Sequence, residues 1–261
     1  MIPKQQRAKQ HIDEAARLIQ EYFSTEPIRL STKISECGQR NIVYISEIAK
    51  CDPFVACVVG DALFNLRSSL DHMMMMIFLR NCNPQALKIE KVYFPIKSGE
   101  VEFNKWCKKD DLAQQLPPAI LDSLKTLKPY KGGSRSLSTL HELNNIDKHR
   151  NLVVSAINYK SMSMLSMLDK ESLGNVVESK HRNMMAQMMS SIWINDKNMR
   201  QEATVGQEIT SYKLGKTPGD PNIKFDFSII EANVEVRPVI DLLAEIDQEV
   251  TSVHNALQSF M

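Results

Sequence analysis

The chain has 261 residues, of which 43% are hydrophobic and 24% charged, and its formal net charge is +1 at pH 7. This length and composition are typical of an ordinary globular protein that can bury a sizeable core. The balanced charge excludes broad electrostatic binding of nucleic acid, but it does not exclude a local basic groove. The five cysteines form no CxxC pair or zinc spacing, so we interpret them as reduced thiols of a cytoplasmic protein.

Most of the first 150 residues are predicted to be helical, because apolar side chains recur there every three or four residues. Pro27 ends the first of these helices, and Asp52 followed by Pro53 begins the longest. Two strand-like segments lie between them. The predicted elements are helices at 4–24, 53–80, 100–109, 117–127 and 136–148, strands at 28–35 and 41–48, and an extended segment at 91–96.

The composition changes after Arg150, where Val, Ile, Ser, Thr and Tyr become more frequent. We therefore predict an antiparallel sheet over about residues 151–232, with apolar side chains alternating around Phe225 and Phe227. The stretch 180–189 is ambiguous, because its Met, Ala and Gln residues favour a helix.

The clearest predicted helix lies near the C-terminus, at about residues 236–259. Its apolar side chains recur at spacings of four and three from Val239 to Phe260, which is the pattern of a heptad seam. Two partners fit this seam. One is the N-terminal helix of the same chain, and the other is the same helix of a second subunit, so that the 239–260 seam would make a homo-oligomer.

Together these elements predict an α+β fold in a single domain of residues 1–261. A helical bundle core at about 53–149 is joined to an antiparallel β-sheet portion, with long N- and C-terminal helices. The N-terminus has no apolar signal region, and the most apolar run, 73–79, is too short to span a bilayer. No Gly-rich dinucleotide motif or Walker A lysine is present. We therefore expect a cytoplasmic protein with no membrane partner and no cofactor.

Charged side chains occur where the pattern predicts burial. The long central helix is apolar around most of its circumference, yet it carries Arg67, Asp71 and His72. The helix predicted at 136–148 carries a similar mixture at its C-terminal end, with Asp147 and, just after it, His149. Charged groups seldom enter a core unpaired, so we predict that the two helices meet and that these five residues form one polar cluster. Within it, Arg67 and Asp71 are four residues apart and are predicted to form an ion pair.

This predicted cluster has three interpretations. It can be a hydrogen-bonded network that sets the register of two helices in a non-catalytic binding or structural protein. It can be a catalytic site. It can also hold a metal in a hydrolase, because two His and two carboxylates in a helical bundle suit zinc, manganese or iron. The Glu-x-x-His spacing of di-iron bundles is absent, so no metal ligand is assigned.

Four segments resemble an uncharacterised family of bacterial and phage proteins. The segments are GDALFNLRSSLDH, YFPI, LKPYKGG and LHELNNIDKHRNLV, and the family pattern is GDxLxNLRSxLDH…FPI…LxPY…LNNIDKHR. The resemblance covers roughly residues 55–155. It implies a shared fold and a shared polar cluster but no particular activity.

A looser resemblance concerns the spacing of Arg67 and His72, with Ser68 beside the arginine. This is similar to the signature of HEPN domains, which are helical bundles in many toxin and antiviral systems. The resemblance implies a metal-independent endoribonuclease that acts on RNA. His72 would then move the proton of the 2′-hydroxyl or leaving group, and Arg67 would stabilise charge on the phosphate. Asp71, Asp147 and His149 would be orienting partners.

Overall fold

The structure is a computed structural model that describes residues 2–83, 85, 89–150, 152, 154–163, 193–194, 203–214, 222–231 and 236–261. Contacts within the chain divide it into two compact units. The helical unit comprises Met1–Arg17, Pro53–Leu152 and Ile240–Met261, and the β-rich unit comprises Leu18–Asp52 and Val153–Val239. The predicted α+β class is confirmed, since a helical core occurs with antiparallel strands. The single domain stays a prediction.

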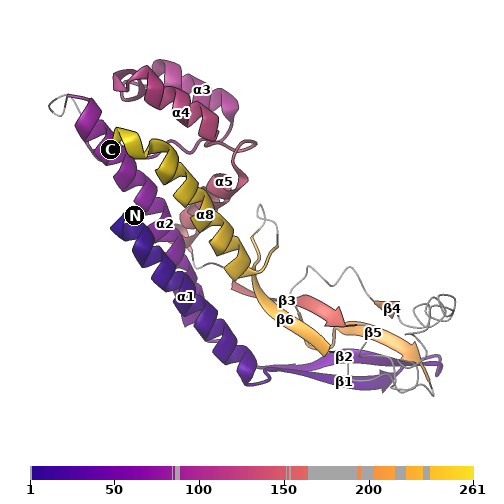
Figure 1. The fold of residues 1–261 in the computed structure, drawn as a ribbon. Coiled ribbons are helices and arrows are strands. Elements are labelled where there is room, and N and C mark those ends of the chain that lie inside the picture. Colours follow the sequence, from indigo (N-terminus) through magenta and orange to yellow (C-terminus); the bar gives the residue numbers. More distant parts are fainter. Residues whose placement is uncertain are drawn as a thin grey trace, which may run out of the picture. The chain divides into compact units, whose positions relative to one another are not determined.

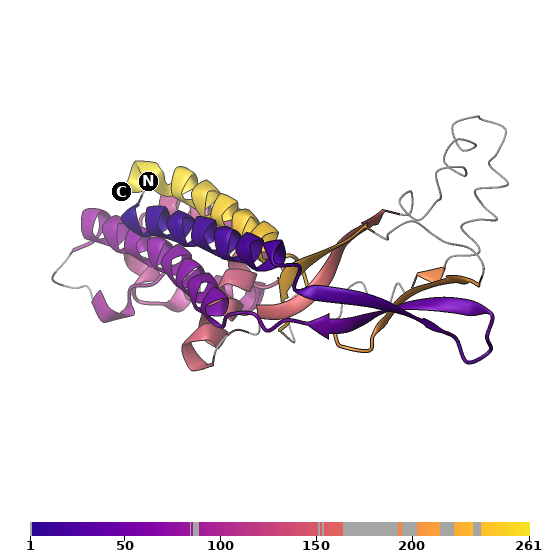
Figure 2. The same ribbon diagram turned by 90° about the horizontal axis from the view of Figure 1, so that it is seen from below.

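Three long helices run side by side in the helical unit (Figures 1 and 2). They are α1 (Pro3–Ser24), which begins in this unit, α2 (Phe54–Asn81) and α8 (Val239–Leu257). α2 is buried over most of its circumference, as its sequence predicts. Although α2 is 28 residues long, neither it nor any other helix in the described part of the chain is long and apolar enough to cross a membrane.

The heptad seam of α8 is buried within the chain itself. Leu243, Ile246, Val250, Val253 and Leu257 have no exposed surface. At the edge of the seam, the side-chain amide nitrogen of one α1 residue, Gln5, donates to Oδ1 of Asp247 (3.0 Å) and to Oγ1 of Thr251 (2.7 Å). Of the two partners considered for the seam, the structure contains the intrachain one, and homo-oligomerisation stays a prediction.

Shorter helices complete the unit. These are α3 (Glu100–Lys109), α4 (Pro118–Leu127), α5 (Arg135–His149) and the 3₁₀ turns η2 (Ile89–Lys91), η3 (Ala113–Gln115) and η6 (Gln258–Phe260). Ser134 caps α5, because its hydroxyl oxygen accepts from the backbone N–H of Leu137 (3.3 Å). The same hydroxyl donates to Glu249 of α8 (2.6 Å), and the hydroxyl of Ser136 donates to Glu245 (2.8 Å). These bonds fix the start of α5 against α8.

The β-rich unit contains two antiparallel sheets. β1 (Ile28–Ile34), β2 (Arg40–Ile48), β5 (Glu208–Lys213) and β4 (Trp193–Ile194) form one sheet in the order β1-β2-β5-β4. β3 (Val154–Ser163) pairs with β6 (Asn222–Ile229) in the other. The rings of Tyr22, Phe23 and Phe227 pack together with centroids 5.1–5.4 Å apart. The ambiguous stretch 180–189 lies outside the described residues.

Candidate functional site

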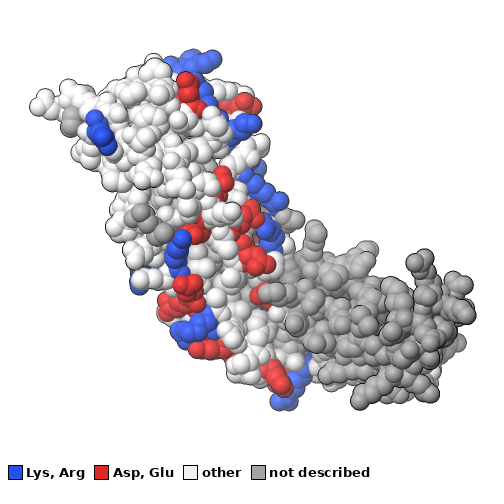
Figure 3. All heavy atoms as spheres, in the orientation of Figure 1, with Lys and Arg blue, Asp and Glu red and all other residues white. Residues whose placement is uncertain are grey.

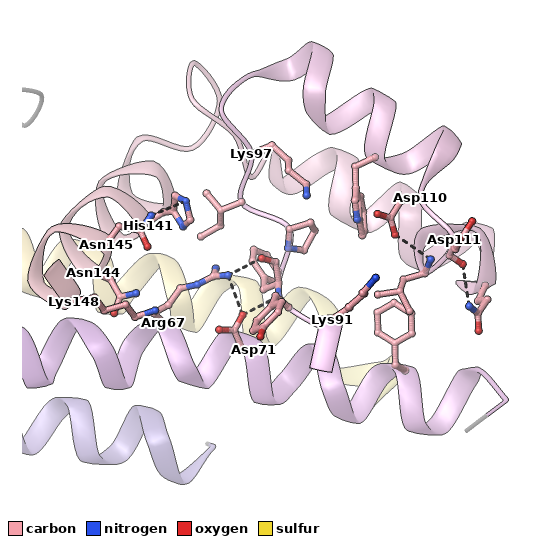
Figure 4. A pocket seen from close by; sticks show the side chains of 18 residues that line it. Arg67, Asp71, Lys91, Lys97, Asp110, Asp111, His141, Asn144, Asn145 and Lys148 are labelled. Carbon is pink, nitrogen blue, oxygen red and sulfur yellow. Dashed lines mark hydrogen bonds and ion pairs between the residues drawn. The ribbon is translucent and has the colours of Figure 1, made fainter. Parts of the chain in front are cut away.

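A cavity of about 560 Å³ lies in the helical unit beside α2 and α5, and we call it the Arg67 pocket (Figure 4). Its other walls come from residues 91–97 and from the end of α3 with the turn that follows it. The pocket combines cations, acids and amides with a few aromatic rings. Its polar lining consists of Arg67, Asp71, Lys91, Lys97, Asp110, Asp111, Gln115, His141, Asn144, Asn145 and Lys148.

An ion pair forms the floor of the pocket. Nη2 of Arg67 lies 3.0 Å from Oδ1 of Asp71, one helical turn further along α2. The same nitrogen donates to the backbone carbonyl of Phe94 (2.9 Å), and Oδ1 of Asp71 accepts from the backbone N–H of Phe94 (2.9 Å). The pair therefore satisfies both backbone groups of one residue and fixes the segment 91–97 onto α2.

The guanidinium of Arg67 is the most deeply buried charge in the pocket. Its side chain is only 10% exposed, and burial lowers the pKa of Arg67 while the Asp71 carboxylate opposes that shift. An arginine stays protonated even so. Its second terminal nitrogen, Nη1, is buried and has no hydrogen-bond partner among the described residues. A buried charged donor without a partner is costly, and an acceptor placed beside it would remove that cost.

α5 supplies a histidine on the same side of the pocket. Nε2 of His141 lies 3.1 Å from the side-chain amide nitrogen of Asn145. Burial lowers the pKa of His141, and the charges of Arg67 and Lys148 lower it further against the opposing effect of nearby acids. These effects favour the uncharged form of the imidazole.

The far part of the pocket combines an ammonium, an aromatic ring and two acids. Nζ of Lys97 lies 5.6 Å from the ring centroid of Trp106, and burial lowers the pKa of this lysine. Asp110 accepts hydrogen bonds from the backbone N–H groups of Leu112 (3.0 Å) and Ala113 (3.4 Å), so part of its charge is used to cap a turn. Figure 4 shows Lys97 between the acids and the α2–α5 side of the pocket.

The structure brings α2 and α5 together, as the sequence predicts, but it does not form one cluster of the five candidate residues. Arg67 and Asp71 share the pocket. Asp147 lies elsewhere, because it packs on Gly60 of α2, where a Cβ would lie 2.5 Å from Oδ1 of Asp147. Burial and the charge of the neighbouring Asp61 raise the pKa of Asp147. Asp147 is therefore not among the residues that line the Arg67 pocket, and its role in a site stays a prediction.

His149 is exposed at the end of α5 and does not line the Arg67 pocket. The structure therefore does not place His149 with Asp71 in this pocket, and its role in a site stays a prediction. His141, eight residues earlier, takes the place that we expected His149 to fill. Because α5 lies along α2, a difference of two turns along α5 decides which histidine reaches Arg67.

His72 is exposed and lines a different cavity of about 830 Å³. Its neighbours there are Met75, Met76 and, from the terminal helices, Gln5 and His254. His72 and Asp71 therefore line different cavities, and a catalytic role of His72 stays a prediction. The physical reason is helical geometry: five residues rotate the chain by about 140° beyond one full turn, so positions 67 and 72 face different sides of α2.

Four contributors to the pocket were missed from the sequence. Phe94 contributes only backbone groups, which no side-chain pattern reveals. Asn145 and His141 are four residues apart on α5, and this spacing is a helical signal that would have found the pair. Lys148 follows His141 at the same face two turns later.

Within the described ranges, no group of three or more His, Cys, Asp or Glu side chains is placed to hold a metal ion. The protein therefore has an α+β fold, and its helical unit carries a pocket lined by both cations and carboxylates, including the Arg67–Asp71 ion pair. No protein-family model, curated protein or solved structure matches the chain.

Proposed function

We propose that the protein is a binding protein and that the Arg67 pocket holds a phosphate group of RNA. Two facts about Arg67 carry this proposal. The residue lines a cavity of about 560 Å³, and its buried Nη1 has no hydrogen-bond partner among the described residues. Guanidinium groups are well suited to phosphate, because they present several N–H donors in one plane.

The charges around Arg67 support an anionic ligand. Asp71 offsets the charge of Arg67, but Lys91, Lys97 and Lys148 also line the pocket, against Asp110 and Asp111. Asp110 is used in part to cap a turn at the far end. Apart from the Arg67–Asp71 pair, three lysines therefore line the pocket against two carboxylates, a small excess of positive charge.

Binding is tested with a short fluorescein-labelled single-stranded RNA and with inorganic phosphate as the minimal probe. Lys148→Glu reverses an exposed charge at the pocket and is expected to weaken RNA binding about five- to tenfold. Lys105→Glu, an equal charge change on an exposed face of α3, is the matched control. Fluorescence anisotropy at low salt measures both, with calorimetry for phosphate. Equal affinities of the two variants for both probes would reject the proposal.

A second candidate function is favoured by one observation, that His141 and Arg67 line the same pocket, where burial lowers the pKa of His141. This pairing suits metal-independent RNA cleavage. In such a reaction the 2′-hydroxyl attacks the adjacent phosphorus, the 5′-oxygen leaves, and a cyclic phosphate forms. His141 would accept the hydroxyl proton, and Arg67 would stabilise the charge on phosphorus-bound oxygens. The resemblance to HEPN domains assigns the proton instead to His72, which lines the other cavity.

Cleavage is measured on labelled RNA in the presence of EDTA, comparing His141→Ala with His72→Ala. If His141 moves the proton, only the first variant loses activity, by about 100-fold or more. Loss only in His72→Ala would support the assignment by resemblance. Intact RNA at high concentrations of the unaltered protein would exclude both and leave the binding function.

A further inference from the structure

The cavity of about 830 Å³ that His72 lines differs from the Arg67 pocket in charge, and we call it the second cavity. Among the described residues that line it, none is Asp, Glu, Lys or Arg. Figure 3 shows that the helical unit carries few charged side chains near the two chain ends on the face in view. The lining of the second cavity instead includes two imidazoles and three thioethers, from His72, His254, Met75, Met76 and Met261.

α2 contributes three of these five side chains from one face. His72, Met75 and Met76 are spaced by three and four residues, so they lie side by side on the helix. This face divides a run of four methionines. Met73 and Met74 have no exposed surface and belong to the core. Met75 and Met76 line the second cavity, and Met76 is 40% exposed. Core packing therefore explains the first two thioethers of the run but not the last two.

A chain of hydrogen bonds fixes the tautomer of His254 on α8. The side-chain nitrogen of Gln5 donates to Oδ1 of Asp247 (3.0 Å) and to Oγ1 of Thr251 (2.7 Å). The oxygen of the same amide, Oε1, therefore faces Nδ1 of His254, at a distance of 2.9 Å. Because an amide oxygen can only accept, Nδ1 carries a proton, and the lone pair of the uncharged ring is on Nε2.

Nε2 of His254 is buried and has no hydrogen-bond partner among the described residues. The residue is only 7% exposed, although it lines the second cavity. Burial lowers the pKa of His254, while the backbone of Ser69 opposes that shift. The net effect favours the uncharged ring, with its free lone pair. A histidine that binds a metal normally donates its other ring N–H to a fixed acceptor, as His254 does to Gln5.

The donors of the second cavity select a soft ion of low charge. Thioether sulfur is a ligand of Cu(I), and imidazole also binds copper, whereas carboxylate and carbonyl oxygens suit Mg²⁺, Ca²⁺ and Mn²⁺. Structural Zn²⁺ sites use four Cys, His or carboxylate ligands, and the described lining supplies only two imidazoles of that kind. No described lining residue brings a negative charge, so a divalent ion would cost more to bury here than a monovalent one.

We propose that the second cavity binds one Cu(I) ion through the imidazole of His254 and the thioethers of Met75 and Met76, with His72 and Met261 as further donors. Methionine side chains are flexible, so their sulfur atoms can turn towards an ion while the helices stay in place. Gln5 is a positioning residue, because it acts on the ion only through His254. The second cavity shares no lining residue with the Arg67 pocket, so this site is independent of RNA binding.

NMR of the methionine methyl groups in the full chain tests the site. The probe is Ag(I), a soft monovalent ion that stands in for Cu(I) and is stable in air. Ag(I) in excess over the five cysteines is expected to shift the methyl signals of Met75, Met76 and Met261, and to leave that of Met73 in place. No cysteine is among the described residues of the lining, so thiol binding does not produce these shifts. Unchanged signals of the three lining methionines overturn the proposal.

The affinity is measured from the Met261 signal, with free methionine as the competing ligand that buffers Ag(I). Met76→Leu removes one thioether at nearly constant volume, and His254→Gln removes the imidazole. Each should weaken binding about tenfold or more. Met73→Leu makes the same exchange in the core and is the matched control, with circular dichroism as the check of the fold. Equal affinities of Met76→Leu and Met73→Leu, or tighter binding of Zn²⁺ than of Ag(I), overturn the proposal.

Discussion

The two sides of α2 differ in what surrounds residues that are close neighbours in the chain. On one side, Arg67 and Asp71 are bound to each other and to the backbone of Phe94. On the other side, His72 is exposed and lines the second cavity together with Met75 and Met76. Polar residues on an apolar helix therefore need not belong to one site. The angular position of each residue about the helix axis decides which surroundings it has.

The largest effect that separates the two sides concerns stability. Arg67→Met leaves the Asp71 carboxylate and the carbonyl of Phe94 without their partner, and is expected to lower the free energy of unfolding by about 2–4 kcal/mol. His72→Ala removes an exposed side chain, and should change that free energy by no more than about 0.5 kcal/mol. Urea unfolding followed by circular dichroism measures both variants.

A control refines this test. Asp71→Asn keeps an oxygen that can accept from the N–H of Phe94 but removes the charge, so its effect should fall between the other two. Equal losses in Arg67→Met and His72→Ala would show that the two sides of α2 are not distinct. They would then favour a single polar network, as the sequence alone predicts.

Local sequence patterns predict most helices of the helical unit, but they do not predict how α5 packs along α2. The apolar period predicts α2 and α8, and the four-residue spacing predicts the Arg67–Asp71 pair. Whether His141 or His149 reaches the Arg67 pocket depends on the position of α5 along α2, and the pattern of one helix does not determine that position. Gly60 indicates this position, because a side chain at residue 60 would collide with the carboxylate of Asp147.

The β-rich unit shows the same limit. The strands β1 and β2 follow from alternation and a connecting loop, and the structure pairs them as neighbours. The pairing of β2 with β5 joins residues about 170 positions apart, such as Arg40 with Lys213. Local alternation defines which face of a strand is apolar but not which distant strand it meets. Pairings of this kind are therefore outside what a single sequence predicts.

A smaller effect tests whether both sides of α2 respond to acid. Burial lowers the pKa of His141 in the Arg67 pocket and of His254 in the cavity that His72 also lines, both from an ordinary value of 6.5. Below that value the unfolded chain binds more protons than the folded one at these two positions. Stability from both groups is therefore fully present above pH 6.5 and is lost as the pH falls through their folded pKa values.

We expect the free energy of unfolding to decrease between about pH 6.5 and pH 5, a range in which few carboxylates titrate. His141→Gln and His254→Gln should each flatten this decrease, because glutamine has no proton to gain. In the double variant the flattening of this decrease should equal the sum of the two single effects. The two residues lie on different sides of α2 and have different hydrogen-bond partners, Asn145 for His141 and Gln5 for His254. A strongly non-additive result would mean that the two sides are coupled through the helix.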